Sequence, residues 1–421
     1  MKKMTILLGC LFIYAAVFAQ QQEPELTPVE RLEQQTQLIE ESVTKLQKFK
    51  VSGYIQTQFQ YGEKDASLKV GTANEDLEKS FNRVGIRRGR IKFTYEEGIV
   101  SGVFQLDITE KGVGFKDAYL NLKDPWFGTS ALRAGVFDRP FGYEISYSSS
   151  RRESPERSTI FQTLFPDERD LGGMLVLQAA KTSAWNFLKL EAGLFAGNGI
   201  KQETDNRKDF IGHLSAIKNI GSNANWGLGV SYYNGGVYQG TENVYAMQNK
   251  SFVLNDNVSN KGKFAKREYF GFDGQFNIIS LLGMTQLKGE YLFGTQPGGK
   301  SGSKSPNAST LPNTDTYIRN FSGGYVMLVQ DFGTLPLSAV LKYDRYDPNT
   351  KISNNEIGQN GTDKGDIAYN TLGFGLLWRA SNNIRLQAYY ELINNEKSEN
   401  LIAFKDDLKD NVFTLRLQYK F

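Results

Sequence analysis

The chain has 421 residues with 40% hydrophobic content and a mean hydropathy of −0.43, which excludes a bundle of membrane-spanning helices. The single histidine, His213, and the single cysteine, Cys10, leave little for acid–base chemistry, thiol catalysis or a zinc site. We therefore predict no catalytic residue, no metal and no cofactor. A net charge of +3 gives no bulk attraction to nucleic acid, so no nucleic-acid partner is expected.

The first 19 residues have the pattern of an export signal. Lys2 and Lys3 precede an apolar run over 5–18, and a small residue, Ala19, comes just before the expected cleavage point. Removal of this segment leaves a chain without cysteine and therefore without disulfides. The alternative is lipidation, because Cys10 lies in a lipoprotein-like Leu-Leu-Gly-Cys sequence, although the apolar run before it is short.

Residues 20–49 are predicted to form a periplasmic helical segment. Apolar residues lie at Val29, Leu32, Ile39, Val43 and Leu46. With Thr36 they complete alternating steps of three and four, which is the seam of a coiled coil over about three heptads. So short a helix needs partners to bury this stripe, and copies of the same chain would supply them. A helix that lies on its own barrel, or stays flexible, is the alternative.

From residue 50 to residue 421 the pattern changes to the two-residue period of β-strands. Near the end of the chain, Leu415, Leu417 and Tyr419 share one face, whereas Arg416 and Gln418 share the other. The pattern predicts sixteen strands, most of which are long enough to cross a bilayer when tilted. They cover 50–61, 81–95, 99–108, 115–122, 131–137, 171–180, 187–197, 209–220, 225–236, 268–278, 285–294, 318–330, 337–346, 368–379, 384–394 and 411–421.

The connections between these strands alternate in length. Short turns such as 96–98 and 381–383 alternate with long polar loops such as 138–170, 238–267 and 296–317. An even strand count with this alternation predicts an all-β, 16-stranded antiparallel transmembrane barrel in the outer membrane of a Gram-negative bacterium. Its strands would contact lipid outside and enclose a water-filled channel, with both chain ends on the periplasmic side.

Arginine is concentrated in one part of the predicted barrel. Ten of the eighteen arginines lie between residues 83 and 169, and several should face the lumen or lie on the third long loop. The candidate pore-lining, anion-binding residues are Arg88, Arg90, Lys92, Arg133, Arg139, Arg151, Arg152, Arg157 and Arg169.

Guanidinium groups spaced along a narrow wall can replace part of the hydration shell of a passing anion. The alternative is that these arginines pair with nearby acids such as Asp107, Asp117, Glu156, Glu168 and Asp170, which would stiffen a weakly selective pore. Both interpretations stay open at this point.

The same region resembles the phosphate-selective porin O and P family of outer-membrane porins. The resemblance lies in Arg88-Gly89-Arg90, in Lys116-Asp117-Ala118-Tyr119-Leu120, in the run from Arg133 to Gly142, and in Glu156-Arg157-Ser158 followed by Arg169-Asp170-Leu171-Gly172. It implies a homotrimer of 16-stranded barrels that takes up phosphate or related anions through arginine and lysine side chains. It also implies that residues 20–49 clamp the trimer. The nearly equal number of acids around the third loop departs from strict phosphate selectivity.

Three other features carry weaker predictions. His213 has no second histidine or cysteine to complete a metal site. An outer-membrane barrel enzyme stays an alternative, but the sequence places no serine or aspartate where it would be expected to pair with His213. Gly298-Gly299-Lys300-Ser301 lacks the spacing of a phosphate-binding loop and is predicted to be a mobile surface loop. Large aromatic residues are expected at the membrane interface, at Trp126, Tyr143, Trp185, Trp226, Trp378 and Tyr419.

Overall fold

The computed structural model describes residues 27–421, so the signal peptide expected at 1–19 lies outside the described residues. The chain divides into one unit that ends at Lys50 and a second that runs from Val51 to Phe421. The first contains helix α2 (Pro28–Gln47), which opens with a capping box between Thr27 and Glu30. Its apolar stripe is exposed along the whole helix, at Val29, Leu32, Ile39, Val43 and Leu46.

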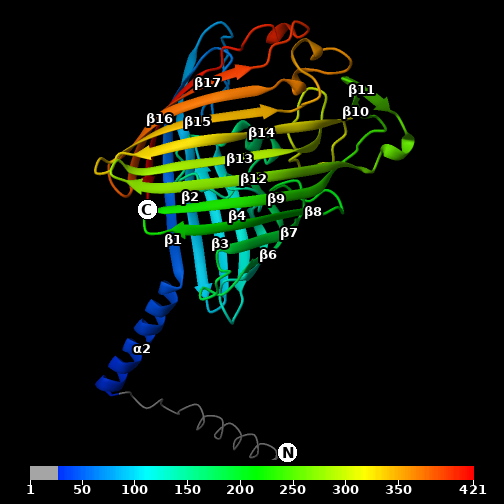
Figure 1. The fold of residues 1–421 in the computed structure, drawn as a ribbon. Helices are drawn as coiled ribbons and strands as arrows, with labels where there is room; N and C mark the ends of the chain where they lie inside the picture. Colours follow the sequence, from blue (N-terminus) through cyan, green and yellow to red (C-terminus); the bar gives the residue numbers. More distant parts are fainter. Residues whose placement is uncertain (1–26) are drawn as a thin grey trace, which may run out of the picture. The chain divides into compact units, whose positions relative to one another are not determined.

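The second unit is a closed antiparallel barrel (Figure 1). The described residues contribute sixteen strands to its wall, and these match the sixteen predicted from the two-residue period. They are β1 (Phe49–Gly62), β2 (Phe81–Glu97), β3 (Val100–Thr109), β4 (Gly112–Lys123), β5 (Ala131–Asp138), β6 (Arg169–Gln178), β7 (Leu188–Phe195), β8 (Asp209–Ile220), β9 (Ala224–Tyr238), β12 (Phe264–Ser280), β13 (Gly283–Gly298), β14 (Thr316–Asp331), β15 (Leu337–Asp347), β16 (Tyr369–Arg379), β17 (Ile384–Asn395) and β18 (Val412–Lys420).

The barrel closes where β1 pairs with β18, from Tyr54↔Lys420 to Gly62↔Val412. On β18 the side chains of Leu415, Leu417 and Tyr419 point out and are exposed, whereas Arg416 and Gln418 point in and are buried. This is the alternation expected of a wall with an apolar outer surface and a polar inner one. Closure pairs the backbone of every wall strand with its two neighbours, which a sheet in hydrocarbon requires.

The connections sort by length as predicted. Turns such as 98–99, 221–223 and 380–383 define a short-turn end of the barrel, and loops such as 139–168, 239–263 and 348–368 define a long-loop end. The loop 239–263 contains a hairpin that the sequence pattern did not predict, formed by β10 (Val244–Gln248) and β11 (Ser251–Asn255). Short 3₁₀ helices lie in the long loops at Val258–Asn260, Asn354–Glu356, Lys364–Asp366 and Ile402–Phe404.

The interior is partly packed, which corrects the expectation of a fully water-filled channel. The third loop, residues 139–168, contains a short helix α3 (Thr159–Leu164), and its apolar side chains are buried against inward-facing aromatic rings of the wall. Phe165, for example, lies 5.6 Å from Tyr269 and 6.0 Å from Tyr233 between ring centroids. The water-accessible space is therefore confined to the part of the lumen that this packing leaves open.

A tight turn brings the third loop against the wall. Gly142 adopts a left-handed backbone angle of +60°, and a Cβ atom there would lie 2.0 Å from Oε2 of Glu290. The free space lets the amides of Tyr143 and Glu144 donate hydrogen bonds to the Glu290 carboxylate at 2.8 and 2.6 Å. Glycine at this position thus fixes where the loop enters the barrel.

The segment Gly298–Ser301, predicted to be a mobile surface loop, is exposed at Lys300 and Ser301 and is also held by hydrogen bonds. The carbonyls of Gly299 and Lys300 accept hydrogen bonds from Arg319, and Ser301 binds Asp363. Further on, Ser305 is buried. Arg319 of β14 lies close enough to hold this loop, and the spacing of residues in the sequence does not reveal that contact.

Five of the six aromatic residues expected at the membrane interface lie at or beside the short-turn end. Trp126 and Trp185 are in turns and are 81% and 65% exposed, and Trp226, Trp378 and Tyr419 are near strand ends. Tyr143 is instead in the third loop, where it stacks on Tyr147, because the loop folds inward. None of the helices formed by residues 27–421 is long and apolar enough to span a membrane.

Candidate functional site

The third loop is tied to the wall on the side of β12–β18. Lys342 on β15 donates to Glu144 at 2.7 Å, and Lys288 on β13 donates to Glu153 at 2.7 Å. All four side chains are buried, so each charge has its counter-charge where water is scarce. Side chains of β17 and β18 also donate to loop carbonyls, as Gln418 does to Ser150 at 3.1 Å.

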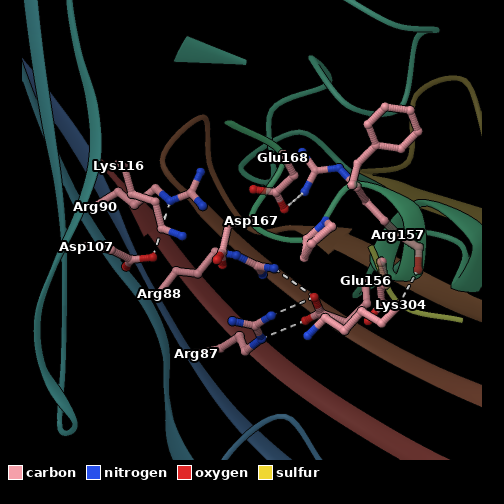
Figure 2. A pocket seen from close by; sticks show the side chains of 13 residues that line it. Arg87, Arg88, Arg90, Asp107, Lys116, Glu156, Arg157, Asp167, Glu168 and Lys304 are labelled. Carbon is pink, nitrogen blue, oxygen red and sulfur yellow. Dashed lines mark hydrogen bonds and ion pairs between the residues drawn. The ribbon is translucent and has the colours of Figure 1, made fainter. Parts of the chain in front are cut away.

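Glu156 ties the loop to the opposite wall and to the barrel seam. Its carboxylate pairs with Arg87 and Arg88 of β2 at 2.8 Å each (Figure 2). It also pairs with Arg416 of β18 at 2.9 Å. Burial raises the pKa of Glu156, but the three guanidinium groups outweigh it and hold that pKa well below its usual range. One carboxylate thus forms ion pairs with three arginines and offsets part of their charge.

Glu168 closes the loop on the side of β6. It pairs with Arg157 of the loop and with Arg169 of β6, the latter at 2.9 Å. Burial raises its pKa, yet the two arginines bring the pKa of Glu168 well below its usual range. Its backbone has a φ of +65°, a strained conformation for a residue with a side chain, so these ion pairs offset a local cost.

Three adjoining pockets follow the wall formed by β2–β5. The outer pocket, near the long-loop end, has a volume of about 280 Å³ and the middle pocket about 220 Å³; they share Arg87, Asp107 and Lys116. The inner pocket, about 210 Å³, shares Arg90 and Arg157 with the middle one. Each volume is several times the roughly 30 Å³ that a liquid water molecule occupies. Because β2 runs from the long-loop end to the short-turn end, the outer, middle and inner pockets follow one another in that direction.

Basic side chains outnumber acidic ones in all three pockets. The outer pocket has four basic residues and one acid, the middle pocket six and four, and the inner pocket five and two. The middle pocket, drawn in Figure 2, places Arg87, Arg88 and Arg90 on one wall and Glu156, Arg157 and Glu168 on the third-loop wall. A passing ion in this series therefore meets a positive excess at every stage.

Some of these cations form no ion pair within the part of the chain that the structure describes. Lys92, Lys116 and Arg133 form no ion pair with any other residue of the described range 27–421. The Arg133 guanidinium instead lies 4.9 Å from the ring centroid of Tyr119 and 5.5 Å from that of Phe137. These rings hold the guanidinium in place while leaving its charge available to a ligand.

Lys116 reaches the lumen through a β-bulge. Gln105 is opposite Asp117, whereas the next residue, Leu106, is opposite Phe115, so Lys116 is the extra residue on β4. A bulge breaks the alternation locally and lets neighbours share a face, and Lys116 and Asp117 both line pockets. Strict two-residue spacing would have turned Lys116 toward lipid, and no signal in the sequence locates the bulge.

The structure brings together six of the nine candidate residues. Arg88, Arg90, Lys92, Arg133, Arg157 and Arg169 line the middle or inner pocket. Arg88, Arg90, Arg157 and Arg169 are also ion-paired, as the alternative interpretation expected, for example Arg169 with Asp117 at 2.6 Å.

The other three candidates lie outside these pockets. Arg139 is buried against Asp170 at 3.1 Å, and Arg152 is buried inside the third loop. Arg151 is exposed, and its carbonyl accepts from Arg385. These three residues lie in the third loop, so their positions depend on how the loop folds and could not be predicted from strand periodicity. Pocket residues that the sequence interpretation missed as candidates are Lys69, Arg87, Lys111, Lys116 and Lys304.

His213 points inward from β8 and lies 2.9 Å from Asp273 of β12, so the expectation that no aspartate pairs with this histidine is wrong. Both side chains are buried, so the pair joins non-adjacent wall strands across β9. No group of three or more histidine, cysteine, aspartate or glutamate residues in 27–421 has the arrangement of a metal site.

Comparison with known proteins identifies the fold. No family model and no curated protein matches the sequence. Solved structures do match: an anion-selective porin from Comamonas acidovorans (12% identity, TM-score 0.52, 89% of this chain and 99% of that chain) and OmpF from Salmonella typhi in complex with daunomycin (11%, 0.54, 89% and 97%). OmpT of Vibrio cholerae in a trimer form is similar (11%, 0.51, 89% and 99%). The chain therefore has the fold of the outer-membrane porins.

Proposed function

We propose that the protein is an outer-membrane porin whose passage, along the β2–β5 wall, favours small hydrophilic anions such as phosphate. The observation that carries this proposal is the series of three adjoining pockets, each with more basic than acidic side chains. An anion that moves along this wall exchanges water for guanidinium and ammonium donors at every step, whereas a cation meets repulsion.

The proposed contacts differ along the wall. Lys116 serves the outer and middle pockets, Arg90 and Arg157 serve the middle and inner pockets, and Lys92 and Arg133 serve the inner pocket. Of these, Lys92, Lys116 and Arg133 are the cations without an ion pair in residues 27–421, so their charge dominates the field that an ion feels. The proposal assigns them the largest share of selectivity.

A weakly selective general porin is the second candidate. The observation in its favour is the number of pocket arginines that pair with acids, such as Arg90 with Asp107 at 3.5 Å and Arg169 with Asp117 at 2.6 Å. Paired charges largely cancel for a distant ion. The two candidates predict different values of one quantity, the ratio of anion to cation permeability, which is well above one for the first and near one for the second.

Planar-bilayer recording in a salt gradient separates these candidates. The proposed function requires ion-conducting pores and a reversal potential on the anion-selective side. A reversal potential near zero supports the general porin. A cation-selective potential, or purified and folded protein that forms no pores, contradicts the proposal.

The localisation and assembly belong to the same proposal. A signal peptide at 1–19 would export the chain, and the short-turn end with residues 20–49 would lie in the periplasm. We propose a homotrimer in which the exposed stripe of α2 packs against its own copies, because an apolar face in heptad steps buries itself best in that way. Deletion of residues 21–48 should shift the unheated protein from trimer to monomer on a gel; an unchanged oligomer would contradict the clamp.

A further inference from the structure

We propose, resting on the proposed channel function, that the inner pocket is a binding subsite for anions that carry hydroxyl groups, such as sugar phosphates. The two walls of this pocket differ in chemistry. The barrel side presents cations, aromatic rings and the carboxylates of Asp117 and Asp138, which both pair with Arg169. The third-loop side presents serine hydroxyls. A solute with a charged end and a polyol end would match both walls at once.

The cationic wall supplies the site for the phosphate group. Lys92 and Arg133 have no ion pair in residues 27–421, and Arg90 is held by Asp107 at a long 3.5 Å. The Arg133 guanidinium lies over Tyr119 and donates one long hydrogen bond, 3.4 Å, to Asn121. Its remaining donors are free to form the bidentate contact that phosphate favours.

The hydroxyl wall supplies the site for the polyol. Ser146 and Ser148 line the pocket and are exposed, and each hydroxyl can donate and accept. Their internal contacts are weak or neutral: Ser146 donates to the carbonyl of Tyr143 at 3.3 Å, and Ser148 lies 3.0 Å from Ser150 Oγ. A sugar hydroxyl can replace or join these bonds without leaving a buried charge unpaired.

The middle pocket offers no such match. There the third loop contributes Glu156, Asp167 and Glu168 opposite the arginines, so the loop wall is acidic. Carboxylates repel the anionic end of a solute. Glu156 also occupies the facing guanidinium groups of Arg87 and Arg88, and Glu168 pairs with Arg157 of the loop itself. Binding of the combined anion and polyol is therefore assigned to the inner pocket.

The position of Ser146 and Ser148 is well determined by the loop around them. Ser149 Oγ lies 2.5 Å from Tyr54 Oη, and its carbonyl accepts from Gln56 at 3.0 Å. These contacts fix the loop to β1 independently of the two exposed hydroxyls. Replacing Ser146 and Ser148 by alanine should thus leave the loop in place.

The test compares block of the single-channel chloride current by glucose 6-phosphate, inorganic phosphate and glucose. The double variant Ser146→Ala/Ser148→Ala is set beside Ser222→Ala, an exposed serine of the β8–β9 turn. Wild type should bind glucose 6-phosphate at least tenfold more tightly than either phosphate or glucose. The double variant should lose about threefold to tenfold of that affinity, as expected for one lost neutral hydrogen bond, with phosphate block unchanged.

The outcomes separate this inference from the proposed function. Equal block by glucose 6-phosphate and phosphate, or equal loss for both in the double variant, overturns the subsite while an anion-selective reversal potential leaves the channel function standing. Arg133→Gln should weaken block by both phosphates and not by glucose. If it weakens neither, the assignment of Arg133 to the anionic end is wrong.

Discussion

The two sides of the barrel interior use the third loop in opposite ways. On the β12–β18 side the loop is attached by buried ion pairs such as Lys342 with Glu144, and by packed aromatic rings around Phe165. On the β2–β5 side Glu156 ties the loop to Arg87 and Arg88, but three pockets stay open and some of their cations have no ion pair among the described residues. The comparison teaches that close packing on one side and a few ion pairs on the other hold the loop so that a defined passage remains between them.

The largest effect is expected on the packed side. Phe161 is buried, lies 6.0 Å from Phe165 and 6.4 Å from Tyr325 between ring centroids, and Phe161→Ala should cost about 4 kcal/mol of folding free energy. Urea-dependent folding in lipid vesicles measures this cost. The control Phe332→Ala, at an exposed turn, should cost under about 1 kcal/mol. Equal costs would show that the ring cluster does not hold the loop.

Removal of the Glu156 charge should raise the anion selectivity of the passage along β2–β5. Glu156→Gln keeps the size of the side chain and releases Arg87, Arg88 and Arg416 from their shared counter-charge. Anion permeability relative to cation permeability should rise severalfold, read from the reversal potential. Glu242→Gln, on an exposed part of the loop 239–263, serves as the matched control and should change nothing. A shift toward cations would contradict the assigned role of these arginines.

A pH series sharpens the account of how the loop is held. Because the folded-state pKa of Glu168 is well below its usual value, its contribution to stability is complete above about pH 4.3 and is lost as the pH falls further. The stability difference between wild type and Glu168→Gln should thus stay constant from pH 7 to about pH 5. It should shrink below about pH 4, because the unfolded chain then takes up a proton at Glu168 that the folded protein still excludes. Shrinkage already between pH 7 and pH 5 would argue against a lowered pKa.

The smallest change is expected in total conductance, which depends less than ion selectivity on any one cation, and the bulge on β4 tests it. Lys116→Gln removes a charge that the outer and middle pockets share, while Arg87 and Arg90 stay in place. Conductance at low salt should fall about twofold and converge with wild type at 1 M salt, where the screening length is about 3 Å. Lys218→Gln, near the short-turn end of β8, is the control. An effect that does not depend on salt would point to a structural role for Lys116.

Most of the wall was predictable from the sequence, and its lining was predictable in part. All sixteen wall strands follow from apolar and polar alternation, as at Leu415, Arg416 and Leu417, because lipid and lumen impose opposite demands on adjacent residues. Loop contacts do not follow from that rule. Arg139 and Arg152 are buried and do not line any of the three pockets. Lys304, in contrast, reaches the middle pocket from a loop that was predicted to lie at the surface.

The same limit explains the errors in the interior. Sequence spacing predicts which side chains point inward, but not that Tyr233 and Tyr269 meet Phe165 from a loop far away in the chain. It also cannot show that Lys116 occupies a bulge, since the bulge appears only in the register between β3 and β4. Strand pairing and loop insertion are long-range properties of the closed barrel.

The most direct test of the central claim is the salt-gradient reversal potential of Arg133→Glu beside that of wild type. Arg133 lines the inner pocket and makes no ion pair in residues 27–421, so its charge should act on passing ions without cancellation. We expect an anion-selective potential for wild type and a shift to zero or to cation selectivity for the variant. The same potential in both proteins would contradict a passage governed by the unpaired cations of the β2–β5 wall.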